Sequence, residues 1–358
     1  MSKQNTTSAL RMSISEAEEF LVDVMSYNAK QIKAGKPFEK LAKPLLLGQP
    51  GCGKTSIVFA AAKRIGYDVN PMNAAPMDPT DMMGLPDNRH VGDDFITVWS
   101  KQETFMMQPN TVHFLDEVTK APHMMNSLAS FIHEGRVGRH HLPAGSLVVG
   151  AGNRLEDKSG DTALPGFVAD RFIIVNVYNT YKHFLDYGAN SGLSPKILGY
   201  IAWRADRAFG YNADQVKNPT HRSWEMADSV VDMGMPMSRM LVTLAGTVGE
   251  PAAVDFLAYL KFSDDLDTPE QVIANPTGAR VPSGDDAQGK MYSMVSSLIG
   301  HANKKTIGPI MTYFGRLPSK EFVVYALKDL MVRNKELNAA PEVKKWKLEN
   351  QALFAPVI

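Results

Sequence analysis

The chain has 358 residues, of which 44% are hydrophobic and 21% charged, enough apolar material for the cores of about two or three domains. Its 38 basic and 38 acidic residues give zero formal net charge, which argues against a protein that grips nucleic acid over its whole surface and leaves room only for a local basic patch. The single cysteine excludes a disulfide scaffold within one chain. With no apolar run that could span a membrane and no signal-peptide pattern, we expect a cytoplasmic protein.

The N-terminal half alternates helical and strand patterns. The first dozen residues are polar and are expected to fray, and an amphipathic helix should follow a Ser-x-x-Glu cap, formed by Ser13 with Glu16 or by Ser15 with Glu18. A short apolar strand, PLLL (44–47), precedes a glycine-rich turn and a helix. Three further strands are expected in TVHFLDE, SLVVGAGN and RFIIVNV, with a helix in APHMMNSLASFIHEG. This alternation indicates a parallel α/β sheet.

The pattern changes near residue 178, where we place a domain boundary. Helical patterns without strand runs follow in SPKILGYIAWRADRAFGY, HRSWEMADSVVDMG, AVDFLAYLKF, KMYSMVSSLIGHANK and SKEFVVYALKDLMVRN. The stretch 267–286 is rich in Pro, Gly and Asp and is expected to be a long surface loop.

The most specific motif is GQPGCGKTS, which matches G-x-x-x-x-G-K-[ST] between a predicted strand and a predicted helix. Glycines let successive backbone N–H groups surround a polyphosphate, and the helix N-terminus adds further donors. Lys54 would neutralise the β- and γ-phosphates of ATP, and Thr55 would offer its hydroxyl to Mg²⁺. The alternative, a chance glycine-rich turn, is disfavoured by the strand and helix on either side. The predicted binding residues are Gly48, Gln49, Pro50, Gly51, Cys52, Gly53, Lys54, Thr55 and Ser56.

Two acids end the next apolar strand, VHFLDE. Asp116 is placed to hold Mg²⁺ together with Thr55, and Glu117 to polarise the attacking water as a general base. The alternative is an acidic helix N-cap. The neighbouring phosphate-binding motif favours the catalytic interpretation.

A third apolar strand, in LVVGAGNRLED, ends on Gly152 and is followed at once by polar residues. A simple turn would also suit Gly and Asn. Because the carboxyl ends of parallel strands meet at one edge of a sheet, Asn153 is expected near Lys54 and Asp116. Its amide could orient the attacking water or contact the γ-phosphate.

This order of motifs resembles AAA+ ATPases. The resemblance implies that Asn153 is sensor 1, that Arg171 in VADRF is the arginine finger, and that Arg222 in PTHRSWE is sensor 2. We place Arg171 at the sheet edge beside Asn153. The implied fold class is α/β, an AAA+ P-loop NTPase with a parallel sheet, a helical lid and a helical C-terminal extension. The expected divisions are an N-terminal helical segment (1–40), the α/β ATPase domain (41–178), the lid (179–250) and the extension (251–358).

Longer segments are similar to the MoxR-like branch of AAA+ proteins, in particular its phage and bacterial members: HFLDEVTKAPHMMNSLASFIHEGRV, DPTDMMGLP, PTHRSWE and LAGTVGEPAAVDFLAYL. The resemblance implies a homo-oligomeric ring, a hexamer, that hydrolyses ATP with Mg²⁺ to remodel a protein client. It also implies a partner with a von Willebrand factor A domain. Two alternatives are a DNA-acting motor or loader and a nucleotide-controlled switch. Neutral net charge argues against the first, and Glu117 argues against the second.

The resemblance further implies two hairpins, one around NRHVGDDFITVW and one from Arg136 to Gly145. Phe95 and Trp99 of the first would contact a client in the channel of the ring, although alternation in FITVW suits a core strand equally well. Several histidines are close in sequence but lack a metal-binding spacing such as H-E-x-x-H, so zinc is not expected. They are His113, His123, His133, His140 and His141.

Overall fold

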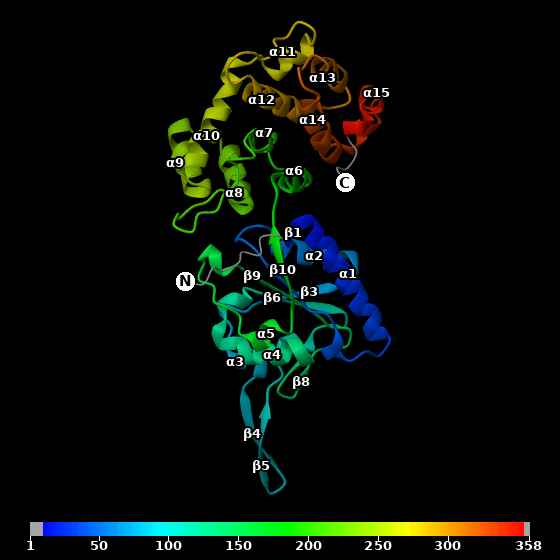
Figure 1. Cartoon of the computed structure of the whole chain (residues 1–358), viewed down its shortest axis with the longest axis vertical. Coiled ribbons are helices and arrows are strands. Elements are labelled where there is room, and N and C mark those ends of the chain that lie inside the picture. Colours follow the sequence, from blue (N-terminus) through cyan, green and yellow to red (C-terminus); the bar gives the residue numbers. More distant parts are fainter. Residues whose placement is uncertain (1–9, 354–358) are drawn as a thin grey trace. The chain divides into compact units, whose positions relative to one another are not determined.

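The computed structural model describes residues 10–353, which divide into two compact units. The first ends at Asn179 and the second begins at Thr180 (Figure 1). Within these residues, none of the helices combines the length and apolar character needed to cross a membrane.

The first unit is built on a six-stranded sheet with strand order β1-β10-β2-β9-β6-β3, in which all neighbouring strands are parallel. Its strands are β1 (Arg11–Ser13), β2 (Pro44–Leu47), β3 (Asp68–Asn73), β6 (Thr111–Asp116), β9 (Leu147–Gly152) and β10 (Ile173–Tyr178). The expectation that the first dozen residues fray is wrong for β1, which pairs with the edge of β10. Residues 1–9 lie outside the described part of the chain.

Helices cover both faces of this sheet (Figure 1). They are α1 (Ile14–Lys33), α2 (Lys54–Arg64), α3 (Pro79–Met83), α4 (Met125–Glu134) and α5 (Gly166–Ala169). Neighbouring residues of one strand point to opposite faces: Leu46 joins the cluster formed with α1 and α2, and Leu45 joins the cluster formed with α4. Of the two caps left open by the sequence, Ser13 with Glu16 forms the capping box of α1.

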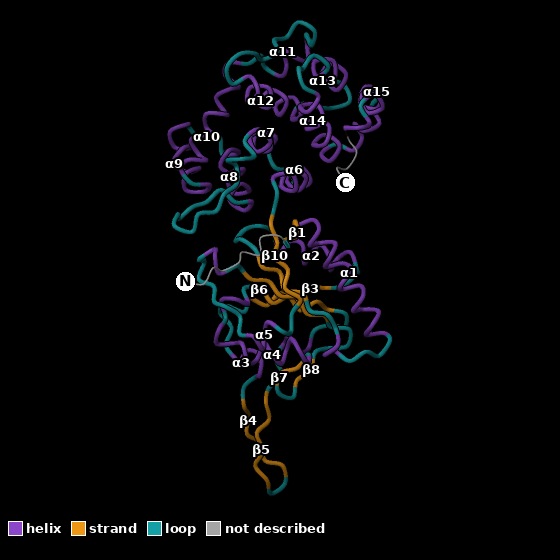
Figure 2. The backbone as a smooth tube through the Cα atoms, viewed as in Figure 1, coloured by secondary structure: helices purple, strands orange, loops and turns teal. Residues whose placement is uncertain are grey.

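Two hairpins extend this unit, as the resemblance implied (Figure 2). One joins β4 (Pro86–Val91) to β5 (Asp94–Trp99), and the other joins β7 (Arg136–Val137) to β8 (His140–His141). Phe95 and Trp99 are 63% and 38% exposed, so the alternative that they belong to the core is wrong. The alternation of FITVW arises from a two-stranded ribbon that has no covering layer among the described residues.

The second unit is helical. Its helices are α6 (Tyr181–Asn190), α7 (Pro195–Trp203), α8 (His221–Asp232), α9 (Met237–Val248), α10 (Glu250–Lys261), α11 (Pro269–Ala274), α12 (Ala287–Gly300), α13 (Ile307–Phe314), α14 (Lys320–Arg333) and α15 (Pro341–Glu349). One apolar cluster includes Trp224 and a second includes Phe314. The expectation of a continuous loop over 267–286 is wrong, because Thr268 caps α11 within it.

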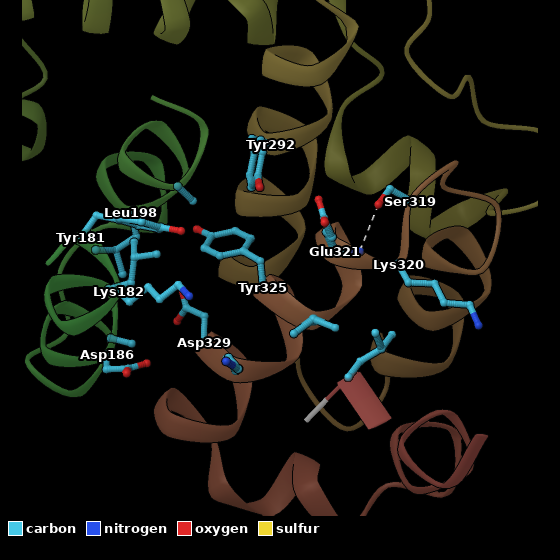
Figure 3. A pocket seen from close by; sticks show the side chains of 16 residues that line it. Tyr181, Lys182, Asp186, Leu198, Tyr292, Ser319, Lys320, Glu321, Tyr325 and Asp329 are labelled. Carbon is cyan, nitrogen blue, oxygen red and sulfur yellow. Dashed lines mark hydrogen bonds between the residues drawn. The ribbon is translucent and has the colours of Figure 1, made fainter. Parts of the chain in front are cut away.

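A cavity of about 700 Å³ lies in the second unit, and all the residues that line it belong to that unit (Figure 3). Tyr181, Tyr292 and Tyr325 contribute aromatic surface. Asp329 lines it from α14 and pairs through Oδ1 with Arg333, while its Oδ2 is buried without a hydrogen-bond partner among residues 10–353. Burial raises the pKa of Asp329.

Candidate nucleotide-binding site

The glycine-rich loop turns from β2 directly into α2. Gly53 caps this helix with a φ of +99°, in the left-handed region that side chains other than glycine rarely adopt. A Cβ at Gly53 would meet no atom within 4 Å, so the backbone here faces open space. Cys52 is buried, and burial raises the pKa of its thiol, which suits a small packing residue.

Lys54, the first residue of α2, is only 8% exposed. Its Nζ donates to the carbonyl oxygens of Gly48 at 2.7 Å and Gln49 at 3.0 Å, and to Asn153 Oδ1 at 3.0 Å. Burial lowers the pKa of Lys54, and no carboxylate within the described chain lies within 4.0 Å of its Nζ. The oxygens that contact this ammonium are all neutral, and the carboxylates of Asp116, Asp157 and Asp161 act on it only from a longer distance. The loop therefore fits an anion such as a polyphosphate.

Thr55 and Asp116 form the position that fits Mg²⁺. The Thr55 hydroxyl donates to Asp116 Oδ2 at 3.0 Å, and Asp116 Oδ1 accepts from the Glu117 N–H at 2.9 Å. Mg²⁺ prefers oxygen ligands and is usually bound by one or two protein groups together with phosphates and water. Within residues 10–353, no group of three or more His, Cys, Asp or Glu side chains could hold a metal ion by itself.

Two of the clustered histidines make contacts with other protein groups. His113 is fully buried, with its Nε2 3.1 Å from Ser146 Oγ, and burial lowers its pKa to about 4. His123 lies against the Met77 carbonyl oxygen instead.

Glu117 follows β6 in an unusual backbone conformation, with a φ of +54°. Holding a residue other than glycine in this region costs about 1–3 kcal/mol, and such residues cluster at functional sites. Its Oε1 accepts from Lys120 Nζ at 3.0 Å, across the short 3₁₀ turn Val118–Lys120. The resting position of the carboxylate is therefore set by a lysine of its own turn.

Asn153 lies at the end of β9 and is 8% exposed. Its bond to Lys54 shows that the strand ends of β2 and β9 bring the amide to the loop. The neighbouring Arg154 has a different role, because it binds Asp157 and Glu156, each at 2.7 Å. These pairs fix the turn that follows the strand.

Arg171 does not lie beside Asn153, and that expectation is wrong. Strand β10 runs parallel to β2, with Ile173 opposite Pro44, while the glycine-rich loop follows Leu47 at the other end of β2. Arg171 precedes β10, whereas Asn153 follows β9, so the two residues lie at opposite edges of the sheet. Arg171 donates through Nη1 to the Phe167 carbonyl oxygen, and its buried Nε has no partner among the described residues.

Arg222 is exposed at the second position of α8, in the helical unit. Its predicted contact with phosphates stays a prediction.

Sequence reasoning missed three residues around Glu117 and Asn153: Thr119, Lys120 and Asp161. Thr119 and Lys120 follow the acid pair closely, but their partners depend on the 3₁₀ turn. Asp161 lies in a loop with no motif. Only the three-dimensional contacts identify it.

Gly152 allows a close approach between β9 and Thr119. A Cβ at this position would lie 2.6 Å from Thr119 Oγ1 and 2.9 Å from its Cγ2. We expect Gly152→Ala to lower the free energy of unfolding by about 1–3 kcal/mol, a typical cost of overpacking. Urea unfolding followed by circular dichroism measures this. Gly166→Ala is the matched control, because a Cβ there meets nothing within 4 Å; equal stability of the two variants would contradict the packing argument.

A comparison with known protein families supports the nucleotide-binding site. Residues 43–188 match the family model of the AAA domain, dynein-related subfamily, a range that includes the glycine-rich loop, Glu117, Asn153 and Arg171. A search of curated proteins found no match.

Among solved structures, the RuvB Holliday junction branch migration motor of Thermotoga maritima is 16% identical, with 84% of this chain and 89% of that chain covered and a TM-score of 0.40. A mutant of the same RuvB is 18% identical, covering 84% and 90%, with a TM-score of 0.41. Residues 43–188 thus match an AAA domain of the dynein-related type, and the chain is an ATP-hydrolysing enzyme with the AAA+ P-loop fold.

Proposed function

We propose that this chain is a MoxR-like AAA+ ATPase that forms a ring, a hexamer, and uses ATP hydrolysis to remodel a protein client. The observation that carries the ATPase part is the convergence of side chains at one sheet edge. There Lys54 contacts Asn153 at 3.0 Å and Thr55 contacts Asp116 at 3.0 Å. A partner with a von Willebrand factor A domain is part of the proposal through the resemblance.

Each residue then has a defined task. The loop N–H groups and Lys54 bind the phosphates, and Thr55 and Asp116 hold the metal. Bound ATP supplies the phosphoryl group, and Mg²⁺ neutralises the charge on it. Glu117 accepts the proton of the attacking water, and Asn153 orients that water. Arg222, in the proposed lid, contributes a further positive charge to the phosphates.

The position of Arg171 supports a ring. It precedes β10 at the sheet edge opposite the glycine-rich loop of its own chain. An arginine there is poorly placed to reach its own phosphates and well placed to meet the site of a neighbouring copy.

The β4–β5 hairpin supports a protein client over nucleic acid. Both strands are exposed along their whole length. Three aspartates against one arginine give the hairpin an acidic balance, which repels a phosphate backbone. Its exposed apolar side chains suit contacts with an unfolded polypeptide instead. They are Val91, Phe95, Ile96, Val98 and Trp99.

The test compares stimulation of ATP hydrolysis by a reduced, alkylated model protein with stimulation by single-stranded and duplex DNA. We expect the polypeptide to stimulate. The double variant Phe95→Ser with Trp99→Ser removes both aromatic side chains. It should raise the concentration of model protein needed for half-maximal stimulation roughly tenfold or more, since an aromatic contact residue contributes about 2 kcal/mol to binding. Val216→Ser, at a residue 97% exposed in the helical unit, is the control. Salt-dependent stimulation by DNA alone would favour a DNA motor, and nucleotide binding without turnover would favour a switch.

A further inference from the structure

The side-chain amide of Asn153 has a defined orientation. Its Oδ1 accepts from Lys54 Nζ at 3.0 Å, and its Nδ2 donates to Asp161 Oδ2 at 3.3 Å. An ammonium can only donate, and an ionised carboxylate can only accept. The two partners therefore allow one orientation of the amide, with its carbonyl oxygen toward the glycine-rich loop and its NH₂ group toward Asp161.

Asp161 is itself held by hydroxyl groups. Its Oδ1 accepts from Thr119 Oγ1 at 2.5 Å, and its Oδ2 accepts from Ser159 Oγ at 2.5 Å. Burial alone would raise the pKa of Asp161, but the hydrogen bonds from Ser159, Thr119 and Asn153 lower it below its usual value. The carboxylate consequently stays ionised at neutral pH and remains an acceptor for the amide.

Thr119 links Asp161 and Asn153 to the 3₁₀ turn that follows Glu117. Its hydroxyl oxygen also accepts from the backbone N–H of Asn153 at 3.2 Å, so one side chain contacts both Asn153 and Asp161. Its carbonyl oxygen accepts from the N–H and the hydroxyl of Thr162, each at 2.8 Å. Thr119 lies two residues after Glu117, so the loop that carries Asp161 is tied to the turn that carries the proposed base.

We propose that Asp161 is a positioning residue for hydrolysis, and that it makes Asn153 present a hydrogen-bond acceptor to the reaction site. This inference rests on the proposed role of Asn153. An oxygen acceptor attracts a donor such as the attacking water and repels a phosphate oxygen. Of the two roles open to Asn153 from the sequence, the contacts with Lys54 and Asp161 favour orienting the water.

The test is a double-mutant cycle with Asp161→Ala, Asn153→Ala and the double variant, with kcat and KM for ATP measured for each. We expect Asp161→Ala to lower kcat about tenfold with little change in KM, the size of effect typical of losing one hydrogen bond to a charged group. If Asp161 acts through Asn153, its replacement should cost nothing further in the Asn153→Ala background. A residue that only stabilises the loop would cost the same in both backgrounds.

Glu156→Ala is the matched control, because Glu156 is an acid of the same loop that pairs with Arg154 and is exposed. Any effect it has should be the same in both backgrounds. If Asp161→Ala does not fold, judged by circular dichroism, the isosteric Asp161→Asn supplies the same comparison. Wild-type turnover in Asn153→Ala would overturn the proposed role of Asn153. A different result would overturn only the positioning inference: slow turnover in Asn153→Ala, with Asp161→Ala lowering kcat by the same factor in the Asn153→Ala background as in the wild-type protein. The role of Asn153 would then stand.

Discussion

Replacing Glu117 by Gln should leave ATP bound while lowering its hydrolysis by roughly 100- to 10,000-fold, the usual contribution of a general base. A carboxamide cannot accept the proton of the attacking water. It has nearly the same size as the carboxylate, and its oxygen can still accept from Lys120, which lies 3.0 Å from Glu117 Oε1. Steady-state phosphate release and equilibrium binding of a fluorescent ATP analogue, measured on the same preparation, separate the two effects.

Glu103→Gln is the control for this variant, because Glu103 is an exposed glutamate on a 3₁₀ turn of the same unit. It should hydrolyse ATP like the wild-type protein. Equal turnover of Glu117→Gln and wild type would remove Glu117 from the mechanism. Loss of nucleotide binding in Glu117→Gln would instead indicate that the carboxylate maintains the fold of the site.

Replacing Arg171 by Ala should also preserve ATP binding and should lower turnover by about a thousandfold, the lower end of what an arginine finger contributes. The physical reason is the charge that grows on the transferring phosphoryl group, which the guanidinium stabilises. Arg171→Lys keeps the charge but loses the planar fork of donors, so it should recover only part of the rate. The rates come from the same phosphate-release measurement.

Arg64→Ala serves as the control for Arg171, since Arg64 is an exposed arginine of this unit that pairs with Glu18 and Glu19 on α1. Its removal should leave turnover close to wild type, because exposed ion pairs contribute little. A loss in Arg64→Ala as large as that in Arg171→Ala would mean that the rate responds to general loss of surface charge.

The sheet and the nucleotide site were predictable from short-range features. Strands such as PLLL and TVHFLD are buried along nearly their whole length because helices cover both faces of the sheet, so consecutive apolar residues such as Leu45 to Leu47 give a clear signal. The glycine-rich loop is contiguous in sequence, so its residues needed no knowledge of the fold. The position of Asn153 near Lys54 was predictable because the carboxyl ends of parallel strands lie at the same edge of the sheet.

Other features depend on contacts between distant residues. The short strand β1 is polar, and pairing with β10 rather than any pattern of its own makes it a strand. The role proposed for Asp161 depends on its contacts with Thr119 and Asn153, which no local motif records. The error at Arg171 came from ignoring strand direction, because a residue before a parallel strand lies at the edge opposite to a residue after one.

Mixing the two inactive variants tests most directly the central claim that a neighbouring copy completes each ATPase site. In a mixed ring, some sites combine the intact Glu117 of an Arg171→Ala subunit with the intact Arg171 of a Glu117→Gln subunit. Steady-state hydrolysis is measured for each variant alone and for the mixture, with subunit exchange verified by labelling the two preparations differently. We predict that the mixture regains activity that neither variant has alone. Verified exchange with no gain in activity would contradict the shared site and the ring built on it.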